Sequence, residues 1–115
     1  MNIELSDKQC QACQGAVSPL TGSDLTELSQ QLKSGWAIVA GKRLGKEYTF
    51  KDYEDGVKFT RQVATIAQEE NHHPDILLCY GKVRVDVWTH KVDGLTEADF
   101  IFAAKTERAY TRNFG

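Results

Sequence analysis

The chain has 115 residues, 41% of them apolar, and a formal charge of −2 at neutral pH. This length and composition fit one folded domain with one core and exclude a disordered chain. The small net charge argues against a nucleic-acid partner. No apolar run approaches the roughly 20 residues that a membrane span needs, and the N-terminus lacks the basic-then-apolar pattern of a secretory signal.

The chain has three cysteines, and this odd number argues against a secreted disulfide framework. We therefore expect a cytoplasmic protein. Cys10 and Cys13 form a CxxC, but a structural zinc site needs four ligands and the chain has no second CxxC. We expect no metal there. Cys79 stands alone in an apolar run and is expected to pack as a small hydrophobic residue.

The first part of the chain predicts an arm followed by a helix. Residues 1–22 have weak periodicity and predict an N-terminal arm, and residues 23–115 predict a single domain. Asp24 and Glu27 resemble a capping box at the start of a helix, and Gly35 is expected to end it. The apolar face of this helix comprises Leu25, Leu28 and Leu32.

Two strands and a long helix are expected next. Apolar alternation predicts a strand over residues 36–40, a turn at Gly41 and an antiparallel strand over residues 44–50. Asp52 is expected to cap a long helix. The apolar stripe predicted for that helix comprises Tyr53, Val57, Val63, Ile66 and Ala67, with Phe59 near its edge.

The stretch EENHHPD, residues 69–75, follows the long helix and contains two of the three histidines. A proline ring pushes the preceding residue out of the helical region. Because Pro74 follows the pair directly, we expect His73 to leave the helix and His72 to remain in its last turn.

The second half of the domain predicts a hairpin and a last helix. A strand is expected over residues 76–80, a turn around Gly81 and a second strand over residues 82–90, with the valines facing the helices. Thr96, with Asp99 three residues later, predicts the capping box of a final helix. Its expected apolar surface comprises Phe100, Ile101, Ala103 and Ala104.

The predicted order is α-β-β-α-β-β-α. Paired strands on short turns favour an α+β fold, in which three helices pack on one face of a four-stranded antiparallel sheet. Such a sheet has edges, and a strand that pairs across a dimer axis would cover one of them.

Three interpretations are open for His72, His73 and His90. Metal binding is disfavoured because adjacent residues point apart on a helix or a strand, whereas chelating pairs usually sit at i,i+4 or i,i+2. Each ring could instead cap helix carbonyls or sit at a strand end without a chemical role. The third interpretation is acid–base chemistry, since histidine exchanges protons near neutrality.

Acid–base chemistry requires that the three histidines come together. If residues 80–82 form the turn of a tight hairpin, His73 at the start of one strand lies opposite His90 at the end of the other. We expect all three rings at the surface of one cleft.

The stretch NHHPDILLCYGKVRVDVWTHKVDGLTEADF resembles the signature of the pterin-4a-carbinolamine dehydratase family, whose animal members double as dimerisation cofactors of a hepatocyte transcription factor. The similarity extends to Trp36, the YTF strand, the long helix and GLTEADFIFAAKTE. The arm with its CxxC resembles bacterial members.

The resemblance implies the fold predicted above, in a homodimer or homotetramer. It implies dehydration of 4a-hydroxytetrahydropterin (4a-hydroxytetrahydrobiopterin) to quinonoid dihydropterin, a hydro-lyase reaction that recycles the pterin left by phenylalanine hydroxylase. Pterin is then the substrate, and no cofactor or metal is implied. The alternative is a non-enzymatic pterin-binding or dimerising partner in regulation or cofactor assembly.

The resemblance also implies roles for individual residues. His72 and His90 correspond to the acid–base pair, and His73 to a residue that orients the ring. Asn71 and Thr89 are expected to line the pterin site. The remaining substrate-binding candidates are Gln68 and Asp99.

Asp99 and Gln68 each carry a further expectation from the resemblance. Asp99 corresponds to a family acid that could orient His90, besides its place in the capping box. Gln68 stands where animal members have a glutamate, four residues before the first histidine, from which it could hydrogen-bond His72 without a charge.

Ile76 replaces an aromatic residue of the animal members, so a stacking contact is missing. Trp88 is expected to be a surface or interface aromatic, with a place in the pterin wall as the second option.

Overall fold

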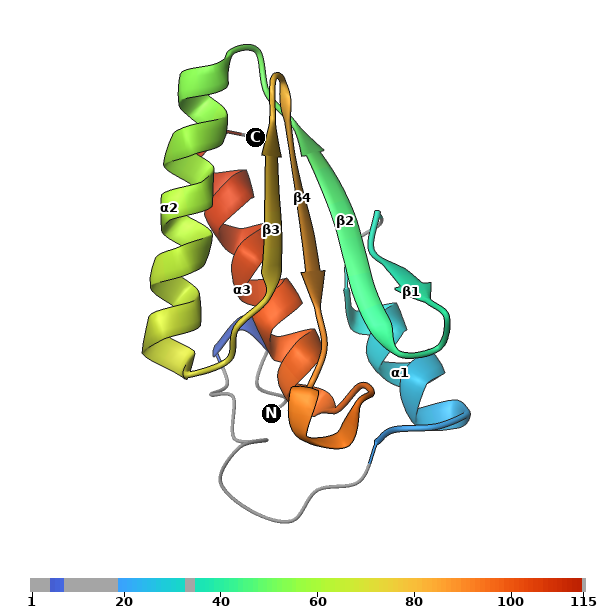
Figure 1. The fold of residues 1–115 in the computed structure, drawn as a ribbon. Coiled ribbons are helices and arrows are strands. Elements are labelled where there is room, and N and C mark those ends of the chain that lie inside the picture. The colour runs from blue at the N-terminus through green and yellow to red at the C-terminus, as the bar shows by residue number, and fades with distance from the viewer. Residues whose placement is uncertain (1–4, 8–18, 33–34, 115) are drawn as a thin grey trace.

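The computed structural model describes residues 5–7, 19–32 and 35–114. The predicted order of helices and strands is confirmed (Figure 1). The elements are α1 (Ser23–Gln31), β1 (Ala37–Val39), β2 (Arg43–Thr49), α2 (Tyr53–Glu70), β3 (Asp75–Cys79), β4 (Lys82–Val87) and α3 (Glu97–Asn113), with 3-10 turns η1 (Leu5–Asp7) and η2 (His90–Val92).

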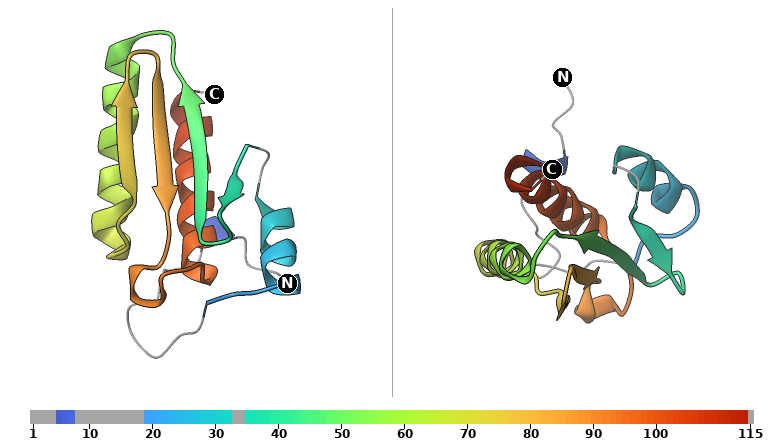
Figure 2. Two further views of the ribbon diagram at one scale, coloured as in Figure 1. Left: turned by 45° about the vertical axis from the view of Figure 1, so that its right-hand side comes forward. Right: turned by 90° about the horizontal axis from the view of Figure 1, so that it is seen from above.

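The four strands form one antiparallel sheet in the order β1-β2-β4-β3, and the helices lie on one of its faces (Figure 2). Cys79 pairs with Lys82, so the β3–β4 turn consists of Tyr80 and Gly81, as predicted. Gly81 has a φ of 80°, a left-handed conformation that glycine adopts without steric cost. This two-residue turn fixes the register of the hairpin.

The core lies between the sheet and the helices. Val83, Val85 and Val87 have no exposed surface, which confirms the predicted valine face of β4. Beside them, aromatic rings pack at tilted and edge-to-face angles, an arrangement that aromatic quadrupoles favour. These rings are Tyr48, Phe50, Phe59, Tyr110 and Phe114.

Helix α2 begins as predicted, because the Asp52 carboxylate accepts a hydrogen bond of 2.9 Å from the Asp55 N–H. Its buried stripe is rotated from the prediction. Phe59 is completely buried at the centre of the stripe, whereas Tyr53, which we expected inside, is 47% exposed. The stripe includes Gly56, where Leu78 of β3 packs closely, with its Cδ1 3.1 Å from where a Cβ would be.

Helix α1 departs from its prediction at both ends. Its N-cap is Gly22, and no side chain caps it, so the capping box expected at Asp24 and Glu27 is wrong. The helix ends at Gln31, and Leu32 is extended. Leu32 still packs against the core with the other two predicted leucines, because an extended residue after the last turn can reach the same surface.

A partly buried ion pair between α3 and β2 was not indicated by the sequence. Glu107 accepts a hydrogen bond of 2.7 Å from the Tyr48 hydroxyl and forms a close ion pair with Lys46. Burial and the adjacent carboxylate raise the pKa of the Tyr48 hydroxyl far above its usual value. The phenol therefore stays protonated and donates, and the contact fastens β2 to α3.

The described parts of the predicted N-terminal arm lie against the domain. Leu5 is buried, and Lys105 of α3 donates to the Ser6 carbonyl at 3.0 Å. Further along, the Leu20 N–H donates to the Leu95 carbonyl at 2.6 Å. Cys10 and Cys13 lie outside the described residues. None of the described helices is long and apolar enough to cross a membrane.

We expect Phe59→Ala to lower the free energy of unfolding by about 3–5 kcal/mol, because it leaves a cavity where Phe59 is completely buried. Tyr53→Ala on the same helix should cost less than about 1 kcal/mol, since half of that side chain is already in water. Urea denaturation of the two variants measures the difference. Equal losses would contradict the observed rotation of the α2 stripe.

Candidate active site

The histidine pair follows the end of α2. Asn71 adopts the left-handed conformation (φ 50°, ψ 44°), and the N–H groups of Asn71 and His72 both donate to the Ala67 carbonyl. Asparagine tolerates this conformation better than most residues and commonly ends helices in this way. The expectation that His72 stays in the last helical turn is therefore wrong, because the chain leaves the helix before Pro74 acts.

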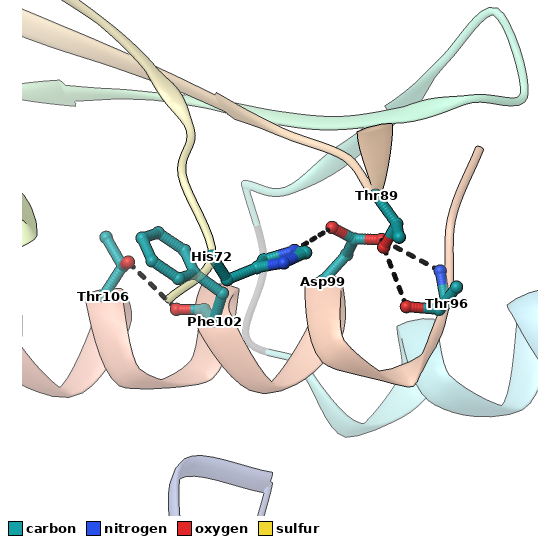
Figure 3. A network of polar contacts seen from close by, with 6 residues as sticks. All are labelled: His72, Thr89, Thr96, Asp99, Phe102 and Thr106. Carbon is teal, nitrogen blue, oxygen red and sulfur yellow. Dashed lines mark hydrogen bonds and ion pairs between the residues drawn. The ribbon is translucent and has the colours of Figure 1, made fainter. Parts of the chain in front are cut away.

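His72 is buried, with only 4% of its surface exposed. Its Nε2 lies 2.7 Å from Oδ1 of Asp99, and its ring lies beside that of Phe102 at a centroid distance of 6.1 Å (Figure 3). The expectation that all three histidines lie at the surface of a cleft is wrong for His72. The loop after α2 turns inward and inserts this ring between the sheet and α3.

The Asp99 carboxylate is completely buried and receives three hydrogen bonds. Oδ1 faces His72, and Oδ2 accepts from the Thr89 hydroxyl at 2.7 Å and from the Thr96 N–H at 2.9 Å. An ionised carboxylate only accepts, so the hydrogen between His72 and Asp99 belongs to Nε2. Nδ1 is then the ring nitrogen of His72 that does not face Asp99.

Thr89 and Thr96 complete the polar network on the other side of Asp99 (Figure 3). The two hydroxyls lie 2.8 Å apart, and the Thr89 hydroxyl already donates to Asp99. The hydroxyl hydrogen between them therefore comes from Thr96. The capping box predicted for Thr96 and Asp99 is confirmed.

The observed contacts of Asp99 differ from two expectations made from the sequence. The histidine that Asp99 contacts is His72, where the sequence analysis placed His90. Thr89, expected to line the pterin site, is completely buried and directs its hydroxyl at Asp99. Both differences arise because the end of β4 passes directly over the start of α3, which brings Thr89 rather than His90 to the carboxylate.

His73 points away from the core and is exposed. Its Nε2 lies 3.1 Å from Oε1 of Gln68, so this glutamine contacts the second histidine and not, as expected, the first. The four-residue spacing no longer aligns Gln68 with His72, because Asn71 has turned the chain out of the helix. Asn71 itself is exposed beside them.

His90 begins the turn η2 and is exposed. Its ring is stacked on that of Trp88, with centroids 4.3 Å apart and planes 12° apart. A backbone bridge between Thr89 and Gly94 closes the loop that carries it.

The loop from α2 to β3 and the loop from β4 to α3 lie at the same end of the sheet, opposite the β3–β4 turn (Figure 1). Asp75 pairs with Asp86, so the same register, continued beyond the strands, sets Trp88 opposite His73. We had expected His90 in that place. Thr89, the neighbour of His90, shares the Asp99 carboxylate with His72. The set of three histidines is thus gathered at one end of the fold.

Two hollows in the described surface lie away from these loops. One of about 350 Å³ borders Phe50 and Arg112, and another of about 380 Å³ lies between α2 and α3 near Ile66 and Lys105. Neither is lined by a histidine. Within residues 5–7, 19–32 and 35–114, no group of three or more His, Cys, Asp or Glu side chains is arranged to hold a metal ion.

The fold is thus a small α+β domain with a buried histidine–carboxylate pair and two exposed histidines on adjoining loops. A family model described as pterin 4 alpha carbinolamine dehydratase matches residues 18–109. The chain belongs to this family.

Relatives support the same assignment. A protein of Rubrobacter xylanophilus is 44% identical over 91% of this chain and 97% of its own length. One from Rickettsia bellii is 42% identical over 93% of this chain and 95% of its own. Both carry the provisional name pterin-4-alpha-carbinolamine dehydratase. A crystal structure from Brucella melitensis, titled transcriptional coactivator/pterin dehydratase, has a TM-score of 0.74 and 32% identity, covering 80% of this chain and 98% of that one.

We expect Thr89→Val to destabilise the protein by about 1–3 kcal/mol, because it removes one of the three donors to a buried carboxylate. Thr65→Val is the matched control, since the Thr65 hydroxyl is exposed and bonds only to its own helix. Thermal unfolding of both variants tests this. A control as unstable as Thr89→Val would show that the loss is not specific to Asp99.

Proposed function

We propose that the protein dehydrates 4a-hydroxytetrahydropterin to quinonoid dihydropterin and water. The observation that carries the proposal is the single carboxylate, Asp99, which holds the His72 ring and the residue next to His90. Family membership supplies the substrate class, and the geometry supplies groups suited to its chemistry.

The reaction moves two protons and no net electrons. The N5 lone pair of the pterin forms a double bond to C4a as the bond from C4a to the hydroxyl breaks. The departing oxygen takes up a proton and leaves as water, and the proton on N5 is removed. A positioned acid and a positioned base are therefore what the enzyme must provide.

We assign the acid–base pair to His72 and His90, with His73 orienting the pterin ring. In His72 the Nε2–H is held by Asp99, which leaves Nδ1 to exchange a proton with substrate. In His90 the ring is exposed and can meet a ligand directly. A carboxylate behind an imidazole fixes its tautomer and stabilises its charged form.

The remaining candidates divide by exposure. Asn71 and Gln68 are exposed beside His73, so we propose that they contact the pterin directly or through His73. Asp99 and Thr89 are completely buried, so we propose that they act through His72 rather than on the substrate. Ile76 is half-buried and offers no ring to stack on a pterin.

The biological setting follows from the same proposal. We propose a cytoplasmic enzyme that returns the pterin released by an aromatic amino acid hydroxylase such as phenylalanine hydroxylase. A homodimer or homotetramer would cover the free edge of β3, where Leu77 is 59% exposed. Light scattering of the purified protein measures the assembly directly.

The dehydration is tested by mixing the protein with freshly generated 4a-hydroxytetrahydropterin and following quinonoid product by absorbance. We expect product to appear faster than in buffer, in proportion to enzyme concentration. A rate equal to the uncatalysed rate would exclude the enzyme. It would favour the alternative, a non-enzymatic pterin-binding or dimerising partner. No feature of the described residues favours that alternative in particular.

We expect His72→Ala and His90→Ala each to lower kcat by at least about 100-fold, the usual contribution of a general acid or base. His90→Ala should change the thermal midpoint little, because the residue is exposed and loses only its stack on Trp88, whereas His72→Ala should lower it, since Asp99 loses a donor.

Lys58→Ala, an exposed change on α2, is the control for both histidine variants. Its kcat should match that of the wild type. Wild-type turnover in His90→Ala would remove that residue from the acid–base pair.

A further inference from the structure

We propose that Trp88 is a positioning residue that sets the ring plane of His90, and that Arg43 holds Trp88 in place. The effect on turnover rests on the proposed function, while the effect on the ring does not. The motivating feature is an exposed catalytic candidate on a loop, a setting that by itself leaves an imidazole free to rotate.

The stack restricts that freedom. The two rings are nearly parallel and 4.3 Å apart, so rotation of the His90 ring would lose its contact with the indole. A parallel stack buries one face of the imidazole and leaves its edge, with both nitrogens, accessible. The arrangement thus fixes the direction in which His90 can exchange a proton.

Trp88 is supported from the neighbouring strand. Leu44 pairs with Val87 and both are buried, so Arg43 and Trp88, the next residues in the register, point to the face of the sheet away from the helices. There the Arg43 Cζ lies 4.0 Å from the centre of the Trp88 ring. A guanidinium packs well on an aromatic face because it is planar and weakly hydrated.

The loop that carries His90 is also fastened at its base. The Thr89–Gly94 bridge closes it, and Lys42 forms an ion pair of 3.1 Å with Asp93. Because that ion pair is exposed, its contribution is small. Lys42 ends the turn between β1 and β2 and Arg43 begins β2, so two adjacent residues support the loop and the indole.

A direct contact between Trp88 and the pterin is the competing interpretation. The two differ in what they predict for kinetics. A wall of the binding site acts on substrate affinity and therefore on KM, whereas a positioning residue acts on the geometry of proton transfer and therefore on kcat.

The test compares Trp88→Phe, which keeps a flat ring, with Trp88→Leu, which keeps apolar bulk without a ring. Tyr80→Leu, at the exposed β3–β4 turn, is the control. Two measurements are made on each: the ring-current shift of the His90 C–H protons by NMR, assigned with His90→Ala, and steady-state kcat and KM.

We expect the His90 protons to be shifted upfield in the wild type and in Trp88→Phe, and to lose that shift in Trp88→Leu. We expect kcat to fall by about 10- to 100-fold in Trp88→Leu, with KM unchanged, and to be largely restored in Trp88→Phe. The control should keep both the shift and the rate.

An unshifted His90 in the wild type, or an unchanged shift in Trp88→Leu, would overturn the stack. Unchanged kcat with raised KM would overturn positioning in favour of a binding wall. If the wild type proves inactive, the proposed function fails on its own, and the NMR comparison still decides whether Trp88 orients the imidazole. Thermal unfolding of Trp88→Leu shows whether a lower kcat reflects a loss of folding instead of a loss of positioning.

Discussion

A carboxylate without exposed surface, that of Asp99, joins three separate segments at one end of the sheet. It accepts hydrogen bonds from the loop after α2, from Thr89 just after β4 and from the N-cap residue of α3. A buried charge is tolerated only when such donors replace the water it has lost. Its place at the N-terminus of α3 adds the favourable end of the helix dipole. The donors that make the charge tolerable are those that orient His72, so stability and site geometry have the same origin.

The three histidines are held in different ways, and the differences match their proposed roles. His72 is fixed by burial and by a charged hydrogen bond, so only one nitrogen remains for chemistry. His90 is exposed but lies flat against an indole. Among the described residues, His73 is exposed and contacts the exposed side chain of Gln68, so it is the least constrained of the three. In the proposed reaction, His72 and His90 would exchange protons from fixed positions. The less constrained His73 could adjust as the substrate enters and the product leaves.

Local sequence patterns predicted the elements well where the cause is local. The alternating valines of β4, the Asp52 cap and the Thr96 capping box depend on residues a few positions apart, and all three are confirmed. Other features depend on the assembled fold. The contact between His72 and Asp99 spans 27 residues and that between Lys46 and Glu107 spans 61, so no spacing rule reveals them. The family resemblance suggested the candidate residues, but it placed the acid Asp99 beside His90, whereas Asp99 contacts His72. The left-handed Asn71 is the one local signal that could have placed His72 outside the helix, because asparagine often ends helices in this conformation.

The turn Leu5–Asp7 packs on α3 across about a hundred residues of chain, through contacts of Ser6 and Asp7 with Lys105 and Arg108. During synthesis the first of these groups is made long before its partners exist. At roughly 5–20 residues per second, the ribosome needs at least about five seconds to cover that distance. The contacts of Ser6 and Asp7 with α3 therefore cannot form until that helix has emerged, so they belong to a late stage of folding during synthesis.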